Sequence, residues 1–367
     1  TAEGEEGRDA AWYINRARQL EASRDHEGAC RVLEEGLEAD KDGPAEGRAM
    51  MTLSLALNLF MAGRLEESAH RAEVAASLFP DPKRQLLAHR QAGSAFGDLG
   101  RLDEAEAHKR RVAELAERIG DAKQLSNVVG DLAEVKRKRG HLAGALAEVD
   151  RAAAAVGTTR HLELIRFEIL RSWGRFYEAM VAVDRASKID PFPNSRAETF
   201  AQGIFAYARA SVFAEQGEPD EARSALALAR KGVAGDAKFT LWCTAAGARV
   251  DALQGRREAA LRAIDEADAA LAGFTQDRNT RSGVFGNLGR ATLALGDFDR
   301  ALGYWDEYLA APPQPVDFPT GHYHLAEAYR GLGDNARARA EYRKAIDSGL
   351  ATHYVALAQS RLRTLPI

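Results

Sequence analysis

Apolar and polar residues alternate along the chain with the period of a helix. A small residue is repeatedly followed, three positions later, by a larger apolar one, as in Ala17 and Leu20, Ala56 and Leu59, and Ala210 and Phe213. This spacing puts both side chains on one face of a helix, whereas a strand would need an apolar residue at every second position. The pattern therefore predicts an all-α protein.

Short glycine-containing segments divide these helical stretches at regular intervals. A first copy at Arg24 lacks the glycine, and the eight later copies begin at Gly63, Gly100, Gly140, Gly174, Gly217, Gly255, Gly296 and Gly333. Neighbouring copies are 34 to 43 residues apart, with a mean of about 39. Glycine ends a helix readily because it adopts a positive φ without a Cβ penalty. The spacing therefore predicts about nine repeated helix–turn–helix units.

The second helix of each unit has its own regular positions. Several glycines are followed by an acidic residue, which meets the positive end of the helix dipole. Five residues after the glycine position stands a small residue: Ala29, Ser68, Ala105, Ala145, Ala179, Ala222, Ala260, Ala301 and Ala338. A larger apolar residue recurs further along, at Leu33, Val149, Val183, Leu226, Ile264, Trp305 and Tyr342. We expect the small positions to lie where two helices approach closely.

Taken together, these positions resemble the tetratricopeptide repeat, most clearly in Asn287–Leu302 and Ala326–Tyr342. The resemblance implies an α-solenoid, a right-handed superhelix of about nine helical hairpins over residues 10–350. An acidic tail at 1–9 precedes it, and a capping helix with the C-terminus at 351–367 closes it. The mean period exceeds the 34 residues of the basic repeat. It is similar to the longer repeats of kinesin light chains, Pins-type adaptors and bacterial regulators of the maltose-activator type.

Composition and charge narrow the classes of function. The net charge is −4, so the chain lacks the basic excess that non-specific nucleic-acid binding needs. No apolar run approaches the length of a membrane span, and the chain opens on an acidic stretch instead of a secretion signal. With only two distant cysteines, these features predict a cytoplasmic protein without direct nucleic-acid or membrane partners. The abundance of Ala, Arg and Gly is typical of a bacterial protein.

The sequence carries no motif for catalysis or cofactor binding. A phosphate-binding loop, a dinucleotide fingerprint, a nucleophile elbow and a paired-cysteine metal motif are all missing. His322 and His324 are two residues apart, which points them to different faces of a helix and makes them a poor metal pair. We expect them to face solvent or the groove. We therefore predict a protein that is not an enzyme and uses no cofactor or metal.

The resemblance implies that the first helix of each hairpin lines a concave groove, where a partner would bind. One candidate set lies in repeats six to nine: Tyr207, Trp242, Arg249, Asn287, Arg290, Tyr323 and Glu327. Arg249 and Arg290 hold the same position in adjacent repeats and together would form a fork for an acidic group. The amide of Asn287 offers a donor and an acceptor to a peptide backbone. The alternative is that Arg290 and Glu327 simply pair across the groove.

Two further sets are candidates. The helix of repeat two is apolar all round at Met50, Leu53, Leu57, Phe60 and Met61, so it is either a groove patch or a helix covered by its neighbours. Basic residues cluster on two successive helices at Lys109, Arg110, Arg111, Lys136, Arg137, Lys138 and Arg139. They predict either a site for an acidic partner or an ordinary solvated face.

These features favour a non-catalytic module that binds a protein or peptide in its groove. Aromatic anchors, asparagine on the backbone, and arginine on an acidic side chain or C-terminal carboxylate would supply the contacts. Within that class we expect a bacterial regulatory or assembly scaffold. Two alternatives stay open: a ligand- or peptide-sensing domain of a larger transcriptional or signalling regulator, and an accessory subunit of an enzyme or defence complex.

Overall fold

The computed structural model describes residues 8–23, 25–189, 195–274, 277–310 and 314–366. All regular structure in these ranges is helical, and they contain no strand. The all-α fold predicted from the apolar spacing is therefore confirmed. No helix in the described ranges is both long enough and apolar enough to cross a membrane. Residues 1–7 of the predicted acidic tail lie outside the described residues.

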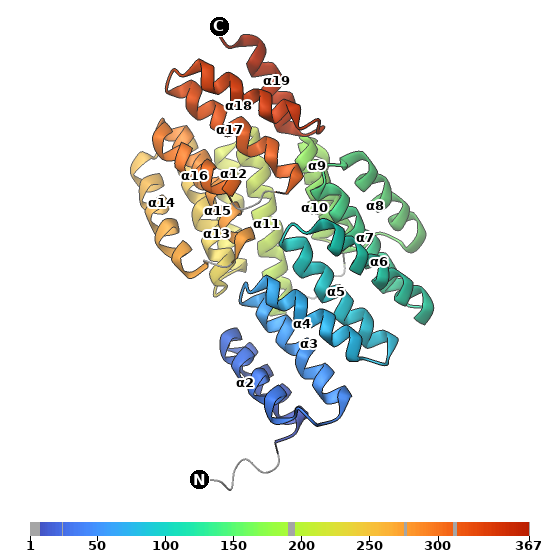
Figure 1. Ribbon diagram of the computed structural model, residues 1–367. Coiled ribbons are helices and arrows are strands. Elements are labelled where there is room, and N and C mark those ends of the chain that lie inside the picture. The colour runs from blue at the N-terminus through green and yellow to red at the C-terminus, as the bar shows by residue number, and fades with distance from the viewer. Residues whose placement is uncertain (1–7, 24, 190–194, 275–276, 311–313, 367) are drawn as a thin grey trace. The chain divides into compact units, whose positions relative to one another are not determined.

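The chain divides into two compact units, of which unit 1 runs to Val135 and unit 2 begins at Lys136. Within unit 1 the first six helices stack in chain order, with α1 beside α3 and α3 beside α5. Figure 1 shows α2 to α6 following one another. The helices of unit 1 are α1 (Ala10–Ala22), α2 (His26–Ala39), α3 (Ala45–Met61), α4 (Leu65–Leu78), α5 (Pro82–Asp98), α6 (Leu102–Ile119) and α7 (Ala122–Lys138), the last of which ends in unit 2.

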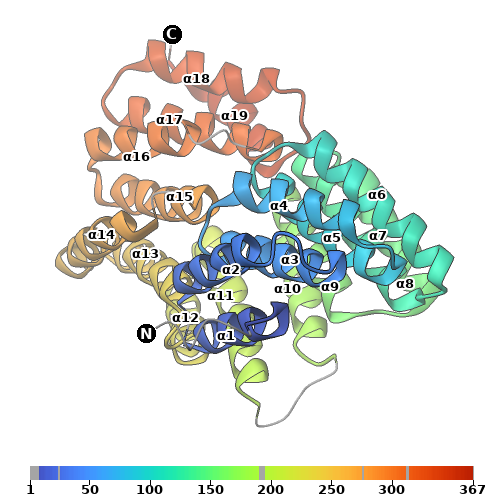
Figure 2. The ribbon, with the colours of Figure 1, turned by 60° about the horizontal axis from the view of Figure 1, so that its bottom comes forward.

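Unit 2 continues the same pattern of hairpins, and Figure 2 shows its later helices following one another in chain order. Its helices are α8 (Leu142–Val156), α9 (Arg160–Trp173), α10 (Phe176–Ala186), α11 (Arg196–Gln216), α12 (Pro219–Gly232), α13 (Ala237–Leu253), α14 (Arg257–Leu271), α15 (Arg278–Leu295), α16 (Phe298–Ala310), α17 (Phe318–Gly331), α18 (Asn335–Asp347) and α19 (His353–Thr364). Two short 3₁₀ helices, Ala272–Phe274 and Pro315–Asp317, precede α15 and α17. The described helices thus form nine consecutive hairpins and a C-terminal helix, which confirms the predicted solenoid.

The turns between paired helices depend on glycine. All eight predicted turn glycines have a positive φ, between 73° and 83°. Gly174 after α9 illustrates the reason: its N–H donates to the carbonyl of Arg171, and the next N–H, of Arg175, donates to the carbonyl of Leu170. This pair of bonds satisfies the last carbonyls of the helix and requires a left-handed residue between them. A residue with a Cβ would be strained there by about 1 kcal/mol.

The small positions lie in the core of every hairpin. All nine residues predicted there, from Ala29 to Ala338, are fully buried. The one polar member, Ser68, donates its hydroxyl to the carbonyl of Ala56 at 2.7 Å and accepts from Gln91 at 3.1 Å. Its polar atom is therefore satisfied, and burial costs little. The larger apolar residues of the second helices, such as Trp305, are buried as well.

Two arginines beside turn glycines, Arg64 and Arg101, each connect their hairpin to the one before it. Arg64 pairs with Glu67 in its own helix at 2.6 Å and with Glu27 in the preceding hairpin at 3.3 Å. Arg101 repeats this arrangement one hairpin later. The pairs are partly exposed, so screening by solvent leaves each of them only a small contribution to stability. Their repetition shows that the first three hairpins meet in the same way.

Candidate functional site

The inner face of unit 2 is the side formed by the first helices of its hairpins. Arg249 of α13 and Arg290 of α15 extend from this face toward Glu215, at the end of α11. Arg249 Nη1 lies 3.1 Å and Arg290 Nε 3.5 Å from the same oxygen, Glu215 Oε1. We call Glu215, Arg249 and Arg290 the inner charge cluster. The two arginines thus form a fork around a carboxylate, and that carboxylate belongs to the chain itself.

A tyrosine from the C-terminal helix completes the cluster. The hydroxyl of Tyr354 donates to Glu215 Oε2 at 2.8 Å and accepts from Arg290 Nη2 at 2.9 Å. The Arg290 guanidinium also lies 5.6 Å from the centre of the Tyr354 ring. Arg249 Nη2 donates to the carbonyl of Ala214 at 3.1 Å, which anchors the fork to α11. Four side chains from α11, α13, α15 and α19 therefore share one hydrogen-bonded network.

The charges in this network are largely shielded from water, since the three charged side chains are 10 to 15% exposed. Burial alone would raise the pKa of Glu215, but the charges of Arg249 and Arg290 hold it well below the ordinary carboxyl value. Burial raises the pKa of Tyr354 to about 12, so its hydroxyl keeps its proton and donates. The cluster therefore holds one carboxylate and two guanidinium groups at neutral pH.

Three other predicted residues lie beside each other on the same face. Tyr207 of α11, Trp242 of α13 and Asn287 of α15 are all half-buried. The ring centroids of Tyr207 and Trp242 are 5.9 Å apart, and Asn287 Nδ2 donates to the carbonyl of Gly283 at 3.0 Å. Trp242 Nε1 is buried and has no hydrogen-bond partner among the described residues. We call Tyr207, Trp242 and Asn287 the aromatic–amide cluster.

Tyr323 and Glu327 of α17 pack against the helices that follow them. The Tyr323 ring is buried, 5.9 Å from the ring of Tyr342 in α18. Glu327 accepts from the hydroxyl of Tyr342 and pairs with Arg361 Nε of α19 at 3.2 Å. Glu327 therefore pairs with Tyr342 and Arg361, and Arg290 belongs to the inner charge cluster. These contacts take the place of the ion pair between Arg290 and Glu327 that was the alternative.

The apolar helix of repeat two is covered on one side only. Leu53 is buried, Met50 and Phe60 are half-buried, and Leu57 and Met61 are 47% and 63% exposed. Neighbouring helices therefore cover part of α3, as one interpretation of the sequence holds. The exposed part is the apolar patch that the other interpretation requires.

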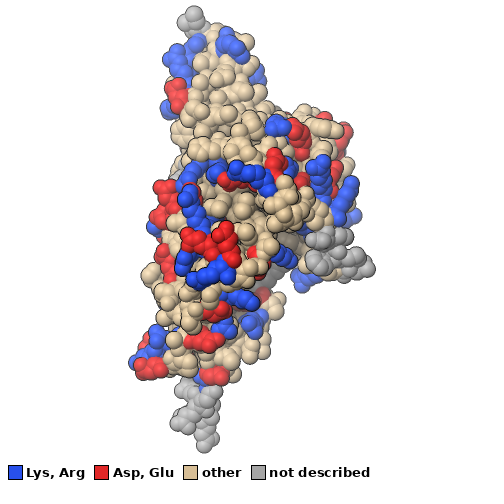
Figure 3. Space-filling view, turned by 90° about the vertical axis from the view of Figure 1, so that its right-hand side faces the viewer, with Lys and Arg blue, Asp and Glu red and all other residues tan. Residues whose placement is uncertain are grey.

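Acidic neighbours offset most of the predicted basic residues. Lys109 is buried, and Arg137 donates to the hydroxyl of Ser172 at 3.2 Å. Four of the basic residues have acidic partners: the pairs are Lys109–Asp131, Arg110–Glu106, Arg111–Glu114 and Lys136–Glu148. Lys138 and Arg139 are half-buried. Figure 3 shows one face of the molecule, on which Lys and Arg are interspersed with Asp and Glu.

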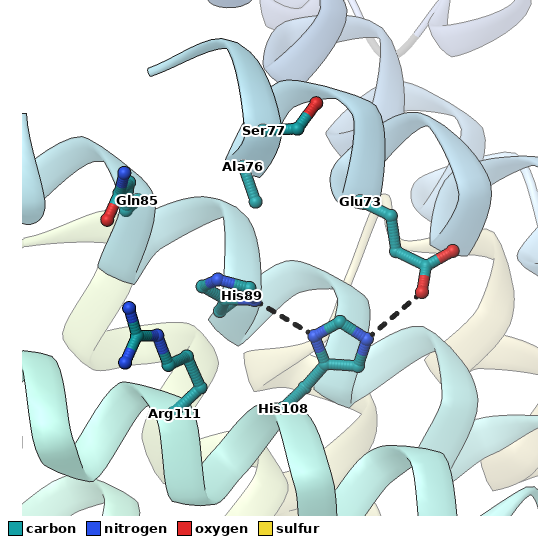
Figure 4. Close-up of a pocket in the computed structure, with 7 residues that line it drawn as sticks. All are labelled: Glu73, Ala76, Ser77, Gln85, His89, His108 and Arg111. Carbon is teal, nitrogen blue, oxygen red and sulfur yellow. Dashed lines mark hydrogen bonds and ion pairs between the residues drawn. The ribbon is translucent and has the colours of Figure 1, made fainter. Parts of the chain in front are cut away.

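Unit 1 contains an open pocket of about 370 Å³ between α4, α5 and α6 (Figure 4). His89 Nδ1 lies 3.0 Å from His108 Nδ1, and His108 Nε2 lies 3.3 Å from Glu73 Oε1. Burial lowers the pKa of His89 to about 4, so its ring is neutral at physiological pH. Within the described ranges, no three His, Cys, Asp or Glu side chains are placed to bind a metal ion together.

The sequence did not single out Glu215 or Tyr354. Nothing in the helical pattern distinguishes Glu215 from the many surface acids, and Tyr354 lies in a segment that was expected only to cap the solenoid. The expectation for His322 is wrong: it is buried, with Nδ1 2.6 Å from Glu341 of α18. His324 is buried too, stacked on Trp305 with ring centroids 4.3 Å apart. The residue one repeat before Arg249 is Ser211, so the position of the arginines in the repeat does not identify Glu215 either.

Comparisons with known proteins bear on the repeats. Models of the tetratricopeptide repeat match residues 204–227, in α11 and α12, and residues 319–348, in α17 and α18. No curated protein sequence matches the chain significantly.

Solved structures with the same fold span nearly the whole chain. A Rap protein complexed with competence and sporulation factor superposes with a TM-score of 0.62 at 13% identity, over 97% of this chain and 99% of the other. The apo form of the quorum sensor NprR from B. thuringiensis gives 0.51 at 15% identity, over 92% and 97%. A human IFIT1 dimer with m7Gppp-AAAA gives 0.55 at 15% identity, over 97% and 80%. At such identities the likeness establishes the fold alone.

The two repeat matches lie within a series of hairpins that share their turn glycine and their buried small residue along the chain. The chain therefore contains tetratricopeptide repeats.

Proposed function

We propose that the protein is a non-catalytic scaffold that binds a peptide, or a segment of a partner protein, along the inner face of unit 2. One observation carries the proposal. This face already binds a side chain from a distant part of the chain, since the hydroxyl of Tyr354 donates to Glu215, which lies 139 positions earlier. A surface that binds the chain's own segment through side-chain hydrogen bonds and ring contacts has the chemistry to bind another.

The aromatic–amide cluster supplies the part of this face that a partner can reach. Tyr207 and Asn287 are half-exposed, and Asn287 donates to the carbonyl of Gly283 and also hydrogen-bonds the hydroxyl of Tyr207. Its carbonyl oxygen suits an N–H group of an extended backbone. The rings of Tyr207 and Trp242 offer an apolar surface for a partner side chain at little entropic cost.

A second candidate is the sensing domain of a larger bacterial, cytoplasmic regulator. Two structures of the same fold are a quorum sensor and a Rap protein complexed with competence and sporulation factor. In this role the bound peptide would be a signal, and its binding would change the contacts of α19. Hydrogen exchange in α19, measured with and without a bound peptide, separates the two roles: a signal changes the exchange, whereas passive docking leaves it unchanged.

The test is selection of random peptides displayed on phage against the full chain, followed by affinity measurements. We expect Asn287→Ala and Tyr207→Phe to weaken the selected peptides, the former by about tenfold, because each removes a hydrogen-bonding group at the centre of the contact. Arg262→Ala is the matched control, since that side chain lies on the second helix α14 and is 74% exposed. If no peptide is selected, or if all three variants bind alike, the proposed function is wrong.

A further inference from the structure

Residues 350–354, which we call the closing segment, connect α18 to α19 and lie against turns that are far away in the sequence. Figure 1 shows the start of α19 beside the end of α9. A Cβ atom on Gly140 would lie 2.6 Å from Leu350 Cδ2, and one on Gly174 would lie 2.7 Å from His353 Nδ1. The His353 ring meets Phe176 of α10 with centroids 5.0 Å apart. The segment therefore docks on two glycine turns, where a side chain would exclude it.

Tyr354 enters the inner charge cluster from this docked segment. Its ring lies among other rings, with centroids 5.3 Å from Tyr323 and 4.9 Å from His324. Its hydroxyl stands between a donor, Arg290 Nη2, and an acceptor, Glu215 Oε2. Arg249 stays on Glu215 without help from the tyrosine, so withdrawal of Tyr354 leaves a paired carboxylate. The cluster can therefore exist both with and without its tyrosine.

The closing segment is built to be released locally. Leu350, His353 and Tyr354 are half-buried and Ala351 is exposed, while Thr352 is buried. The later part of α19 has attachments of its own, since Ala358 and Leu365 are buried in the cluster of apolar residues that includes Tyr342, against which Tyr354 also packs. The first turn of a helix opens at low cost compared with the helix as a whole. Tyr354 can thus leave the cluster while the remainder of α19 stays in place.

The bonding pattern defines what could replace the tyrosine. The group between Arg290 and Glu215 must accept one hydrogen bond and donate another, because the arginine has no acceptor and the ionised carboxylate has no donor. A hydroxyl does both. A carboxylate or phosphate would accept from Arg290 but repel Glu215, and a phenyl ring would do neither. The ring contacts with Tyr323 and His324 further favour a phenol over an aliphatic alcohol.

We propose that the closing segment is an internal competitor for the partner, and that the partner displaces it by presenting a tyrosine whose hydroxyl takes the place of Tyr354 between Glu215 and Arg290. This inference rests on the proposed function and adds the partner's side chain and its regulation. The carboxylate expected for the arginine fork is the chain's own Glu215, so the partner contributes a neutral hydroxyl there.

The test uses a synthetic peptide with the sequence of residues 349–356 and two analogues, in which phenylalanine or phosphotyrosine replaces the tyrosine. Fluorescence anisotropy measures their affinity for the full chain. We expect the wild type to bind the tyrosine peptide weakly, because its own segment occupies the site. Tyr354→Phe keeps the ring contacts and removes both hydrogen bonds, so the peptide should bind about tenfold more tightly. Neither analogue should bind that variant as well as the tyrosine peptide does.

A second variant should also release Tyr354 from its site, without changing any residue of the inner charge cluster. Gly174→Ala places a methyl group against His353 and should displace the segment, with a similar gain in affinity. Gly255→Ala is the control, since this glycine has a φ of 73° but nothing within 4 Å of the added Cβ. It carries the same backbone strain and should bind the peptide as the wild type does. Circular dichroism verifies that all variants are helical.

The inference is overturned if neither Tyr354→Phe nor Gly174→Ala binds the tyrosine peptide more tightly than the wild type. It is also overturned if the phenylalanine or phosphotyrosine peptide binds equally well. If phage-selected peptides still depend on Asn287 in that case, the scaffold function stands and only the tyrosine competitor is rejected. If phage selection also yields no peptide that binds, both the scaffold function and the tyrosine competitor are rejected.

Discussion

Glu215 is the residue on which the inner face of unit 2 depends most. It neutralises one of two arginines that would otherwise lie close together with little access to water. Removing one member of such a group costs more than the group contributes, because the remaining charges keep their loss of hydration. A single neutral substitution therefore tests how much the cluster matters to stability.

We predict that Glu215→Gln lowers the free energy of unfolding by about 3 kcal/mol, since it leaves Arg249 and Arg290 uncompensated. Urea denaturation followed by circular dichroism measures the difference. Glu221→Gln is the matched control, an exposed acid in the neighbouring helix α12, and should change the stability by less than about 0.5 kcal/mol. Equal losses in the two variants would contradict the importance of the cluster.

The effect of Glu215→Gln should depend on pH in one direction. The pKa of Glu215 in the folded protein is depressed, against the effect of burial, by Arg249 and Arg290. Its stabilising contribution is therefore complete above the pKa of about 4.3 in the unfolded chain and is lost as the pH falls toward the folded value. The difference in unfolding free energy between wild type and variant should be constant from neutral pH down to about 5 and then shrink. A difference that grows below pH 4 would contradict this account. Burial lowers the pKa of His324 and His353 and the charge of Glu215 partly offsets this, so these two histidines do not titrate identically in the two proteins.

At the scale of the element, each second helix is stabilised through one buried stripe. On α12, Leu226 is 3% exposed in the core, whereas Leu228 on the same helix is 62% exposed. Both residues are leucine and have the same helix propensity, so burial alone decides how much each side chain contributes to the stability of the fold.

We expect Leu226→Ala to destabilise the protein by about 2–5 kcal/mol, and Leu228→Ala by less than about 0.5 kcal/mol. Thermal unfolding of the two variants, measured side by side with the wild type, gives the comparison. The change in composition is identical, so a similar loss in both would mean that α12 is not packed as described.

The elements were predictable from the sequence because their determinants are local. Gly217 ends one helix and Ala222 packs the next within six residues, so the turn, the close approach and the spacing are all visible along the chain. Only half of the hydrogen-bonded network of the site could be predicted from the sequence. The shared position of Arg249 and Arg290 follows from the repeat, whereas Tyr354 meets Glu215 across 139 residues. No periodic pattern carries information about a side chain that arrives from so far away.

At the scale of the molecule, packing connects mainly neighbours in the sequence. The first core cluster joins Tyr13, Cys30, Leu33, Leu55 and Leu59 from α1, α2 and α3, and the clusters that follow join similarly adjacent helices. In such an array stability is nearly a sum of local terms. A defect should therefore loosen its own surroundings first.

We predict that Leu55→Ala speeds amide hydrogen exchange in α1 to α4 and leaves α13 to α18 unchanged, because Leu55 is fully buried among the first three helices. Hydrogen exchange with mass spectrometry resolves the two regions. Leu57→Ala on the same helix is the control, since that side chain is 47% exposed. Uniformly faster exchange throughout the chain would show that the array unfolds as one cooperative unit instead.

The long reach of Tyr354 also matters while the protein is being made. Synthesis proceeds from the N-terminus, and hairpins with local contacts fold as they leave the ribosome. Glu215 emerges 139 residues before the tyrosine that will bind it. The inner face of unit 2 therefore forms on the nascent chain before Tyr354 is available to bind Glu215 and Arg290. A peptide present during translation meets no competitor there, and its earliest opportunity to bind comes before the protein is complete.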